Sequence, residues 1–450
     1  MKTILLTLLS LLIVQAGWCQ YTQTTDPRIY DIAEAPSPES IENYIKALVS
    51  FGTRNTMSDT VSETRGIGAA RRWIKSELDK ISAECNGCLE VKYQRDMIPG
   101  DPDTRIKEDT WIVNVIAIKR GKTRPNSYVI MSGDIDSRAS NATDATTDAP
   151  GANDNASGMA GVIEAARVLS KYDFESSLVF VGLSGEEQGL FGGKIMAKQA
   201  KADGWDIIGV LNNDMIGNIS GIDGVINNST FRVFSEPTPV TEEENQRRRR
   251  RFYGGEVDGV SRQLARYVDK MTTIYMTNLE AMMIYRLDRF GRGGHHRPFN
   301  DEGFAGIRIM ETHEDYTRQH QDIREENGIQ YGDVIEGVNF EYAAKLTAVN
   351  AITMAGLAWA PAPPKEVKIG GAVQPSTILK WTKTDDENLL GYKVYWRLTT
   401  SPQWDNAKFV GKVDVYTLEN IVIDNFLFGV AAVGVNGEES VVVFPSAVIR

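Results

Sequence analysis

Three apolar segments of this chain, at 177–183, 128–131 and 207–211, lead directly into acidic residues. The acids are Glu186 and Glu187 after the first segment, Asp134 and Asp136 after the second, and Asp214 after the third. Apolar segments of this length are typical of buried strands, and ligands of open α/β sheets gather outside the carboxyl ends of the strands. The acids are therefore expected to converge at one edge of a sheet. Like charges at that density call for cations, so the sequence predicts a metal site.

A further acid, Asp154, lies between the first two clusters in the chain. It belongs to the glycine-bounded segment Gly151-Ala-Asn-Asp154-Asn-Ala-Ser-Gly158. An amphipathic helix is expected directly after this segment, because Met159, Val162, Ile163, Ala166 and Leu169 fall on one helical face. Asp154 is thus predicted to lie in a loop between a strand and a helix.

Strand and helix patterns alternate along the first three quarters of the chain. Strands are expected at 111–119, 127–131, 177–183, 207–211, 281–287 and 306–310, and helices within 40–84 and at about 159–169, 189–202 and 339–357. Such alternation is typical of a sheet whose strands are connected through helices. We therefore expect an α/β fold with a mixed, largely parallel central sheet covered by helices.

The composition and the N-terminus limit the classes of protein to which this chain can belong. With 450 residues, 42% hydrophobic and 24% charged, the chain is typical of a globular protein, and its net charge of −11 argues against nucleic-acid binding. Residues 1–19 have the charged start, short apolar core and small-residue exit of a signal peptide. We expect cleavage after Cys19, with a lipid anchor on that cysteine as the alternative, and a secreted or periplasmic protein with no membrane span.

Two further cysteines occur in Cys85-Asn-Gly-Cys88. In an exported protein this spacing favours a local disulfide across a tight turn, with a redox-active dithiol as the alternative. A zinc ribbon would need a second cysteine pair, which the chain lacks.

A domain boundary is expected at the proline-rich segment 359–364, which would form a stiff linker. The larger domain would then span 20–358. Short alternating strands in 365–450 predict an all-β sandwich, and Gly391–Arg397 and Asp424–Ser440 resemble the third strand and the last hairpin of a fibronectin type III domain. The five consecutive arginines Arg247–Arg251 follow glutamates and are expected on a solvated loop or helix end.

All four histidines lie late in the chain, at His295, His296, His313 and His320. A zinc site normally includes a nitrogen or sulfur ligand, so one imidazole must come from a distant loop. The glycine-rich segment that contains His295 and His296 is the preferred donor. His313 and His320 are expected to line the substrate pocket or to be structural.

Four motifs then occur in a specific order. They are the segment around Asp154, Gly185-Glu-Glu-Gln-Gly-Leu190, Asn212-Asn-Asp214-Met-Ile-Gly217 and His295-His296-Arg-Pro-Phe299. Together they resemble the co-catalytic zinc aminopeptidase family, which includes bacterial leucyl aminopeptidases, glutamate carboxypeptidases and glutaminyl cyclases. The resemblance covers roughly residues 40–358.

The resemblance implies a catalytic arrangement of these residues. Asp154 would bridge two zinc ions, Glu187 and His296 would complete one site, and Asp214 would belong to the other. Glu186 would be the general base that takes a proton from a metal-activated water. The alternative is that Glu186 and Glu187 only cap the next helix.

The first family motif departs from its usual form, because Asp134 stands where the family has a histidine ligand. Asp136 then takes the position that would orient this ligand. A site of Asp134, Asp154 and Asp214 has only oxygen donors and favours Mg²⁺, Mn²⁺ or Ca²⁺. We therefore expect one firm zinc and a second, weaker divalent ion. His295 is expected to contact the ligands or the substrate, with replacement of the missing ligand as its alternative.

The function predicted from these motifs is an exported metal-dependent aminopeptidase that acts on peptides with a free N-terminus. A glutaminyl cyclase-type acyltransferase with a single zinc is one alternative. An inactive binding protein on the peptidase scaffold is the other. The partner of the C-terminal sandwich is not indicated by the sequence.

Overall fold

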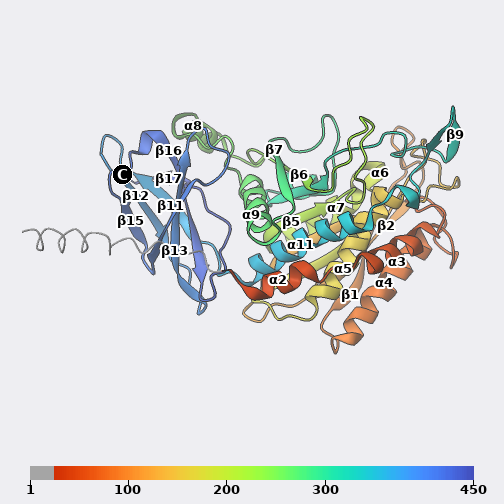
Figure 1. Cartoon of the computed structure of the whole chain (residues 1–450), viewed down its shortest axis with the longest axis horizontal. Helices are drawn as coiled ribbons and strands as arrows, with labels where there is room; N and C mark the ends of the chain where they lie inside the picture. Colours follow the sequence, from red (N-terminus) through yellow and green to blue (C-terminus); the bar gives the residue numbers. More distant parts are fainter. Residues whose placement is uncertain (1–24, 450) are drawn as a thin grey trace, which may run out of the picture.

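The computed structural model describes residues 25–449, in which a helix-covered sheet and a β-sandwich lie side by side (Figure 1). The expected signal peptide and the processing of Cys19 fall outside the described residues. Within residues 25–449, no helix is both long enough and apolar enough to cross a membrane.

The central sheet has eight strands in the order β1-β2-β4-β3-β5-β8-β6-β7. Its strands are β1 (Glu90–Ile98), β2 (Thr110–Lys119), β3 (Arg124–Asp134), β4 (Ser176–Leu183), β5 (Asp206–Asn213), β6 (Thr230–Ser235), β7 (Glu280–Ile284) and β8 (Gly306–Glu311). Strands β4, β3, β5 and β8 are mutually parallel, whereas β6 pairs with β8 antiparallel and with β7 in parallel. The mixed, largely parallel sheet predicted from the sequence is therefore confirmed.

Alternate side chains of β3 are buried on opposite sides of the sheet. Both faces are therefore apolar, and helices cover each of them. Val129 and Met131 belong to one apolar core, and Tyr128 and Ile130 to the other. The larger core packs under α2 (Pro27–Glu34), α3 (Pro38–Val49), α4 (Gly66–Glu84), α5 (Gly158–Leu169), α9 (Val260–Tyr275) and α11 (Phe340–Trp359). The smaller core packs under α7 (Phe191–Ala202) and α10 (His296–Asp301).

The functional edge of the sheet is formed by the carboxyl ends of its parallel strands. Strand β3 ends at Asp134, and β5 ends at Asn213, directly before Asp214. A short π-helical segment (Ala152–Ser157) precedes α5, and the single turn α6 (Glu186–Gly189) follows β4. The expected convergence of strand-end acids at one edge therefore has a structural basis in the parallel register.

The C-terminal region contains two small sheets that share one core. One sheet has the order β15-β12-β11-β17 and the other β14-β13-β16. The strands are β11 (Lys365–Gly370), β12 (Thr377–Thr382), β13 (Leu389–Leu398), β14 (Asn406–Gly411), β15 (Val415–Leu418), β16 (Phe426–Gly434) and β17 (Ala447–Val448). Trp381 and Leu379 of one sheet pack with Val394 and Phe428 of the other. A β-sandwich is thus present, and its relation to fibronectin type III domains stays a prediction.

Buried charges join the sandwich to the domain that contains the central sheet. Arg397 of β13 lies 2.7 Å from Asp258, and Arg266 of α9 lies 2.9 Å from the same carboxylate. All three side chains are almost fully buried. Burial of such charges is tolerated only where opposite charges and hydrogen bonds compensate it, so Asp258 fixes how the two domains meet.

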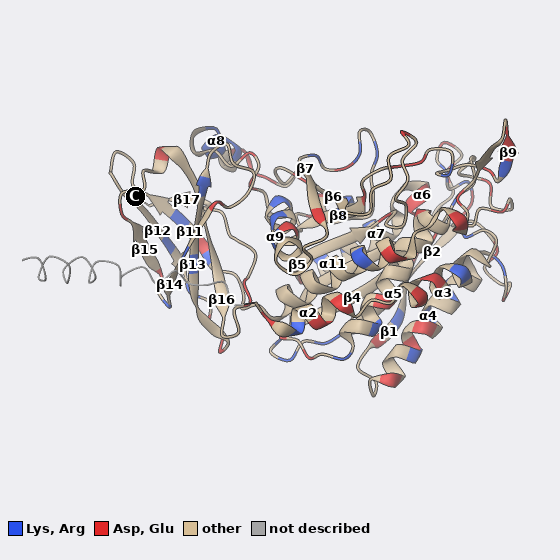
Figure 2. Cartoon of the chain, viewed as in Figure 1, with Lys and Arg blue, Asp and Glu red and all other residues tan. Residues whose placement is uncertain are grey.

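The arginine run forms half of α8 (Glu244–Tyr253), which is exposed and lies beside the sandwich (Figure 2). Arg247 and Arg248 pair with Glu244, and Arg250 pairs with Glu242. The segment expected as a solvated loop or helix end with neighbouring glutamates is thus part of an exposed helix. The Cys85–Cys88 disulfide is also present, directly after α4.

A second buried ion cluster at the domain interface predicts how stability depends on pH. Glu439 of the sandwich lies 2.7 Å from Lys270 of α9 and also pairs with Lys393. Burial raises the pKa of Glu439, but the two lysines outweigh it and lower this pKa from 4.5 to about 2. Because the folded-state pKa is the lower one, the pairing stabilises the fold above about pH 4.5 and is lost as the pH falls toward 2.

We therefore expect the wild-type protein to lose up to about 2 kcal/mol more stability than Glu439→Gln between pH 6 and pH 3. Urea unfolding at several pH values measures the difference. Equal slopes of unfolding free energy against pH for the two proteins would contradict it.

Candidate metal centre

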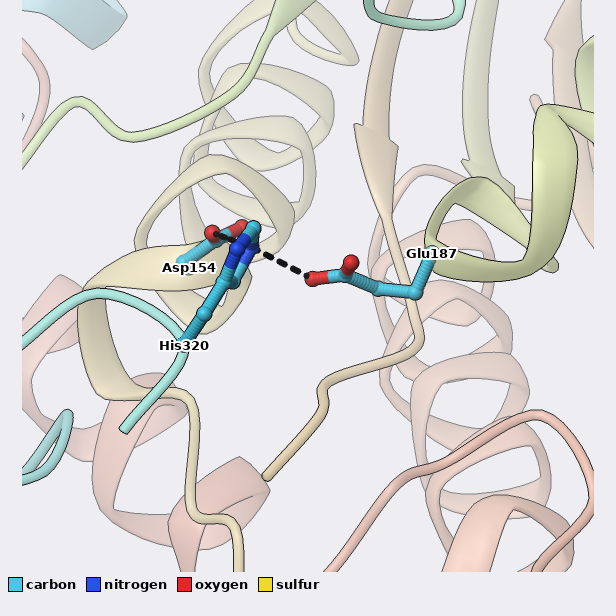
Figure 3. A group of neighbouring side chains, drawn as sticks. All are labelled: Asp154, Glu187 and His320. Carbon is cyan, nitrogen blue, oxygen red and sulfur yellow. Dashed lines mark ion pairs between the residues drawn. The ribbon is translucent and has the colours of Figure 1, made fainter. Parts of the chain in front are cut away.

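Three side chains from distant parts of the chain meet at the carboxyl edge of the sheet (Figure 3). His320 Nε2 lies 3.1 Å from Asp154 Oδ2 and 3.1 Å from Glu187 Oε1. Among residues 25–449, these are the one group of three potential ligands whose donor atoms all lie within 4.8 Å of one another. Two carboxylates and one imidazole match the ligand chemistry of a zinc site that keeps a position open.

The loop that carries Asp154 is held from behind by buried polar residues. Asp333 accepts hydrogen bonds from the backbone N–H groups of Asn153 and Asp154. Arg54 donates to the carbonyls of Pro150 and Gly151, at the start of the same loop. The loop therefore presents the Asp154 carboxylate from a fixed backbone.

Glu186 and Glu187 lie on a sharp turn that Asp136 stabilises. The turn begins at Gly185, whose φ of +76° lies in the left-handed region that favours glycine. The two carboxylate oxygens of Asp136 accept hydrogen bonds from the N–H groups of Glu186 (3.2 Å) and Glu187 (3.0 Å). Asp136 was expected to orient Asp134. Its hydrogen bonds instead fix the backbone that carries the two glutamates.

The charges around His320 match a cation site. Burial lowers the pKa of His320, but Glu187 and Asp154 outweigh it and raise this pKa to about 9. Without a metal, the protonated imidazole is the positive charge between the two carboxylates. A divalent ion would replace that proton, because a histidine ligand must be neutral.

His296 was expected to bind zinc, and this prediction is corrected because the structure places its side chain outside the ligand cluster. His296 begins α10, where its Nε2 donates to the carbonyl oxygen of Leu287 at 2.7 Å and lies 3.5 Å from Asp288. The preceding strand β7 runs antiparallel to β8, so it does not end at the carboxyl edge of the parallel strands. His320 follows the parallel strand β8, and this strand direction was the signal that would have identified it.

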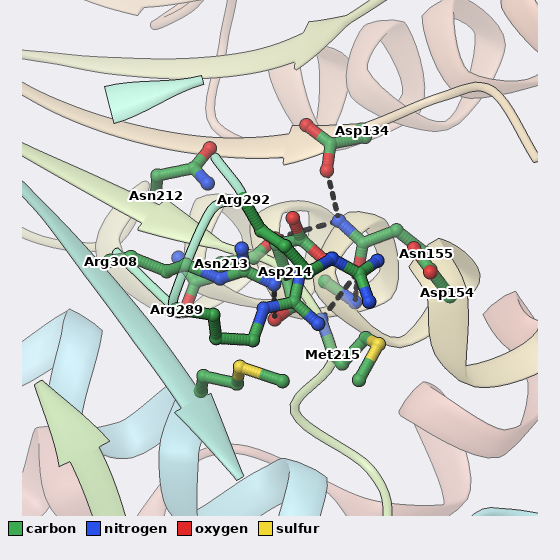
Figure 4. A network of polar contacts seen from close by, with 12 residues as sticks. Asp134, Asp154, Asn155, Asn212, Asn213, Asp214, Met215, Arg289, Arg292 and Arg308 are labelled. Atoms are coloured by element: carbon green, nitrogen blue, oxygen red, sulfur yellow. Dashed lines mark hydrogen bonds and ion pairs between the residues drawn. The ribbon is translucent and has the colours of Figure 1, made fainter. Parts of the chain in front are cut away.

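The expected second metal site stays a prediction. Asp134, Asp154 and Asp214 do not form a three-ligand group among the described residues. Asp134 instead contacts His295 Nδ1 at 2.6 Å, so His295 lies next to a proposed ligand as expected, whereas Asp214 pairs with Arg308 at 3.0 Å (Figure 4). A protein imidazole therefore contacts Asp134, and a guanidinium pairs with Asp214.

Glu186 lies beside the three-ligand group and lines the same cavity, which has a volume of about 530 Å³. Its burial and the neighbouring acids Glu187, Asp214, Asp134 and Asp154 raise the pKa of Glu186 well above its ordinary value. A carboxylate with a raised pKa binds and releases protons closer to neutral pH, which suits a general base.

Basic side chains form the outer wall of this cavity. They are Arg105, Arg138, Lys194, Arg289, Arg292 and Arg297. Arg105 donates to the carbonyl of Glu187, and Arg289 pairs with Glu314. Among the described residues, no carboxylate lies within ion-pair distance of Arg292 or Arg297. The mouth of the cavity therefore carries cationic groups that remain available to a ligand.

Comparisons with known proteins show the family to which the chain is related. Residues 114–333 match the model of peptidase family M28, a range that includes all three clustered ligands. The chain is 40% identical to a probable zinc metalloprotease of Pyrenophora teres f. teres over 94% of this chain and 88% of that protein. It is also 40% identical to a probable zinc metalloprotease of Leptosphaeria maculans, over 93% and 97% of the two chains.

Solved structures show the same fold at low sequence identity. LapB from Legionella pneumophila superimposes with a TM-score of 0.53 at 16% identity, covering 75% of this chain and 77% of that chain. An aminopeptidase from Aneurinibacillus sp. strain AM-1 superimposes with a TM-score of 0.51 at 13% identity, covering 72% and 95%.

The catalytic edge, the ligand chemistry and these relatives together define a zinc-dependent peptidase. The chain belongs to peptidase family M28. The alignments with the two fungal relatives cover more than nine tenths of this chain, so they extend well into the sandwich.

The geometry predicts which histidine retains the metal. His320→Ala removes the one imidazole of the cluster and is expected to lower zinc retention after dialysis at least tenfold. His296→Ala is the matched control, because it removes an equally large buried imidazole that does not contact the cluster. Elemental analysis of both purified variants measures zinc per chain. Zinc loss in the His296 variant with retention in the His320 variant would contradict the assignment.

Proposed function

We propose that this zinc peptidase is an exported aminopeptidase that removes residues from the free N-terminus of peptides, with Glu186 as general base. The observation that carries the proposal is the position of Glu186. It lines the cavity directly beside the Asp154–Glu187–His320 cluster, on a turn fixed by Asp136. Export rests on the sequence of residues 1–19 alone.

Asp154, Glu187 and His320 would hold the zinc. When bound, zinc supplies a Lewis acid that lowers the pKa of a water and polarises the scissile carbonyl. Glu186 accepts the proton of the attacking water as its oxygen bonds to the carbonyl carbon. Glu186 then donates this proton to the nitrogen of the breaking C–N bond, so that an amine and a carboxylic acid leave.

The role of Glu186 predicts a specific loss of turnover. Glu186→Gln keeps the shape of the side chain but cannot accept the proton, so kcat is expected to fall by about 10²- to 10⁴-fold. The zinc content is expected to stay unchanged, because Glu186 is outside the ligand cluster. Hydrolysis of aminoacyl-p-nitroanilides and elemental analysis provide the two measurements.

The control is Glu244→Gln, which makes the same change on the exposed helix α8. Unchanged turnover in Glu186→Gln would remove Glu186 from the role of base. Absence of any hydrolysis by the zinc-loaded wild type would instead favour a binding protein on the peptidase scaffold.

A second candidate is a glutaminyl cyclase-type acyltransferase with one zinc. It is favoured by one observation, the single three-ligand cluster among residues 25–449. Peptides that begin with glutamine separate the two activities. Release of ammonia with formation of a cyclic N-terminus, and no peptide hydrolysis, would support the cyclase. Release of a free N-terminal amino acid supports the peptidase.

The basic wall of the cavity predicts a preference for acidic substrates. Arg292 and Arg297 have no carboxylate partner within ion-pair distance in the described part of the chain, so a substrate carboxylate would find cations there. Peptides with glutamate near the scissile bond are expected to be cleaved about 3- to 10-fold more efficiently than those with glutamine, which corresponds to about 1 kcal/mol.

Arg297→Gln is expected to reduce this ratio of kcat/KM values, whereas Arg248→Gln on α8 leaves it unchanged. Equal kcat/KM values for glutamate and glutamine peptides in the wild type would contradict the preference.

A further inference from the structure

Arg308 places a permanent positive charge beside Asp214, an acid that the family resemblance assigns to a second metal. It lies on β8 and is fully buried. One guanidinium nitrogen lies 3.0 Å from Asp214 Oδ1 and 3.2 Å from the carbonyl oxygen of Asp214 (Figure 4). The contact joins Arg308 to the acid that the family resemblance assigned to the second metal.

The other end of the guanidinium is also fixed. Its second terminal nitrogen donates to both carboxylate oxygens of Asp288, at 3.1 and 3.2 Å, and to the carbonyl oxygen of Gly293. Asp288 and Asp214 therefore hold the group from two sides. An arginine held in this way keeps its charge at every physiological pH, because a guanidinium is not deprotonated in proteins.

Asp134, the other acid expected to bind this metal, is occupied as well. One of its oxygens lies 2.6 Å from His295 Nδ1, and the other accepts a hydrogen bond from Asn155 Nδ2 at 2.9 Å. The Asn155 amide oxygen accepts from the N–H groups of Gly158 and Met215, so its orientation is fixed. Neither oxygen of Asp134 is free of a protein contact.

Electrostatic repulsion from Arg308 also disfavours a second metal ion at Asp214. A divalent cation bound by Asp214 would lie within a few ångströms of the Arg308 guanidinium, in a buried region where repulsion between like charges is weakly screened. The ion would also have to displace the contacts of Arg308 with Asp214 and of His295 with Asp134. The residues at this position therefore do not fit a second metal.

We propose that the Arg308 guanidinium replaces the second metal ion and that the chain holds a single zinc at Asp154, Glu187 and His320. Arg308 is a positioning residue, because it is fully buried and fixes Asp214 without reaching the cavity. The inference rests on the metal site proposed above but not on the reaction, so metal content tests it separately from peptide hydrolysis.

Metal titration of the full-length wild-type protein is the primary test. Equilibrium dialysis against zinc, followed by elemental analysis, is expected to give one tightly held zinc per chain. Cobalt substitution is expected to saturate its visible absorption at one equivalent and to show no magnetic coupling between two ions. Two zincs of similar affinity, one of which is lost in Asp134→Asn, would overturn the proposal. A weak second zinc that persists in Asp134→Asn lies elsewhere and supports it.

Arg308→Met tests the role of the guanidinium directly. It frees Asp214 and removes the repelling charge, so a second zinc that is bound at least tenfold more tightly than in the wild type is expected. Arg289→Met is the matched control, since Arg289 is a neighbouring cavity arginine that pairs with Glu314 and not with Asp214. The Arg289→Met variant is expected to bind one zinc per chain, as the wild type does.

A folded Arg308→Met variant that still binds only one zinc would overturn the claim that Arg308 excludes a second metal ion. If Arg308→Met does not fold, Arg308→Lys retains a charge and is expected to keep one zinc, and the wild-type titration still decides the stoichiometry. A chain with one zinc that cleaves no peptide would contradict the proposed function and leave this inference standing.

Discussion

Mutual repulsion of carboxylates at the edge of the central sheet is the constraint on which the site depends. The parallel strands bring six acids to one place, and burial makes each negative charge costly unless a specific partner compensates it. The structure compensates them in different ways. Asp136 binds backbone N–H groups, Asp214 binds a guanidinium, and Asp154 and Glu187 share the imidazole of His320.

These different partners give the acids different chemistry. Asp136 is held by hydrogen bonds and fixes the turn, whereas Glu186 lines the cavity and has no such partner of its own among the described contacts. Burial, together with the neighbouring acids, raises the pKa of Glu186, which is the property a proton-transferring carboxylate needs. A residue that only capped a helix would gain nothing from this crowding.

The sequence predicted the acids of the site better than its imidazole, for a physical reason. Glu187 and Asp214 follow apolar strands within four residues, so local pattern and parallel pairing place them together. His320 lies in a loop nine residues after β8, and neither its register nor its direction follows from local periodicity. The choice of His296 failed because the direction of β7 depends on its pairing with β6, a tertiary contact.

The same distinction applies to the fold as a whole. The alternation of apolar strands and amphipathic helices predicted the sheet and its helical layers, and β11 begins at Lys365, directly after the proline-rich segment. The docking of the sandwich was not predictable, because Asp258 and Arg397 are 139 residues apart and neither is unusual in its local sequence. Their burial arises only when the two domains meet.

The family has a ligand histidine where this chain has Asp134. This difference is consistent with the position of Arg308 beside Asp214. A histidine there would be a neutral ligand, and a divalent ion would then supply the positive charge that Asp154 and Asp214 require. With an aspartate at 134, the same position has one more negative charge and no nitrogen donor for zinc. A guanidinium beside Asp214 and an imidazole beside Asp134 place protein groups next to these acids. The remaining cluster keeps the nitrogen ligand, and under our proposal zinc would be held only at the side of the site that contains Glu186.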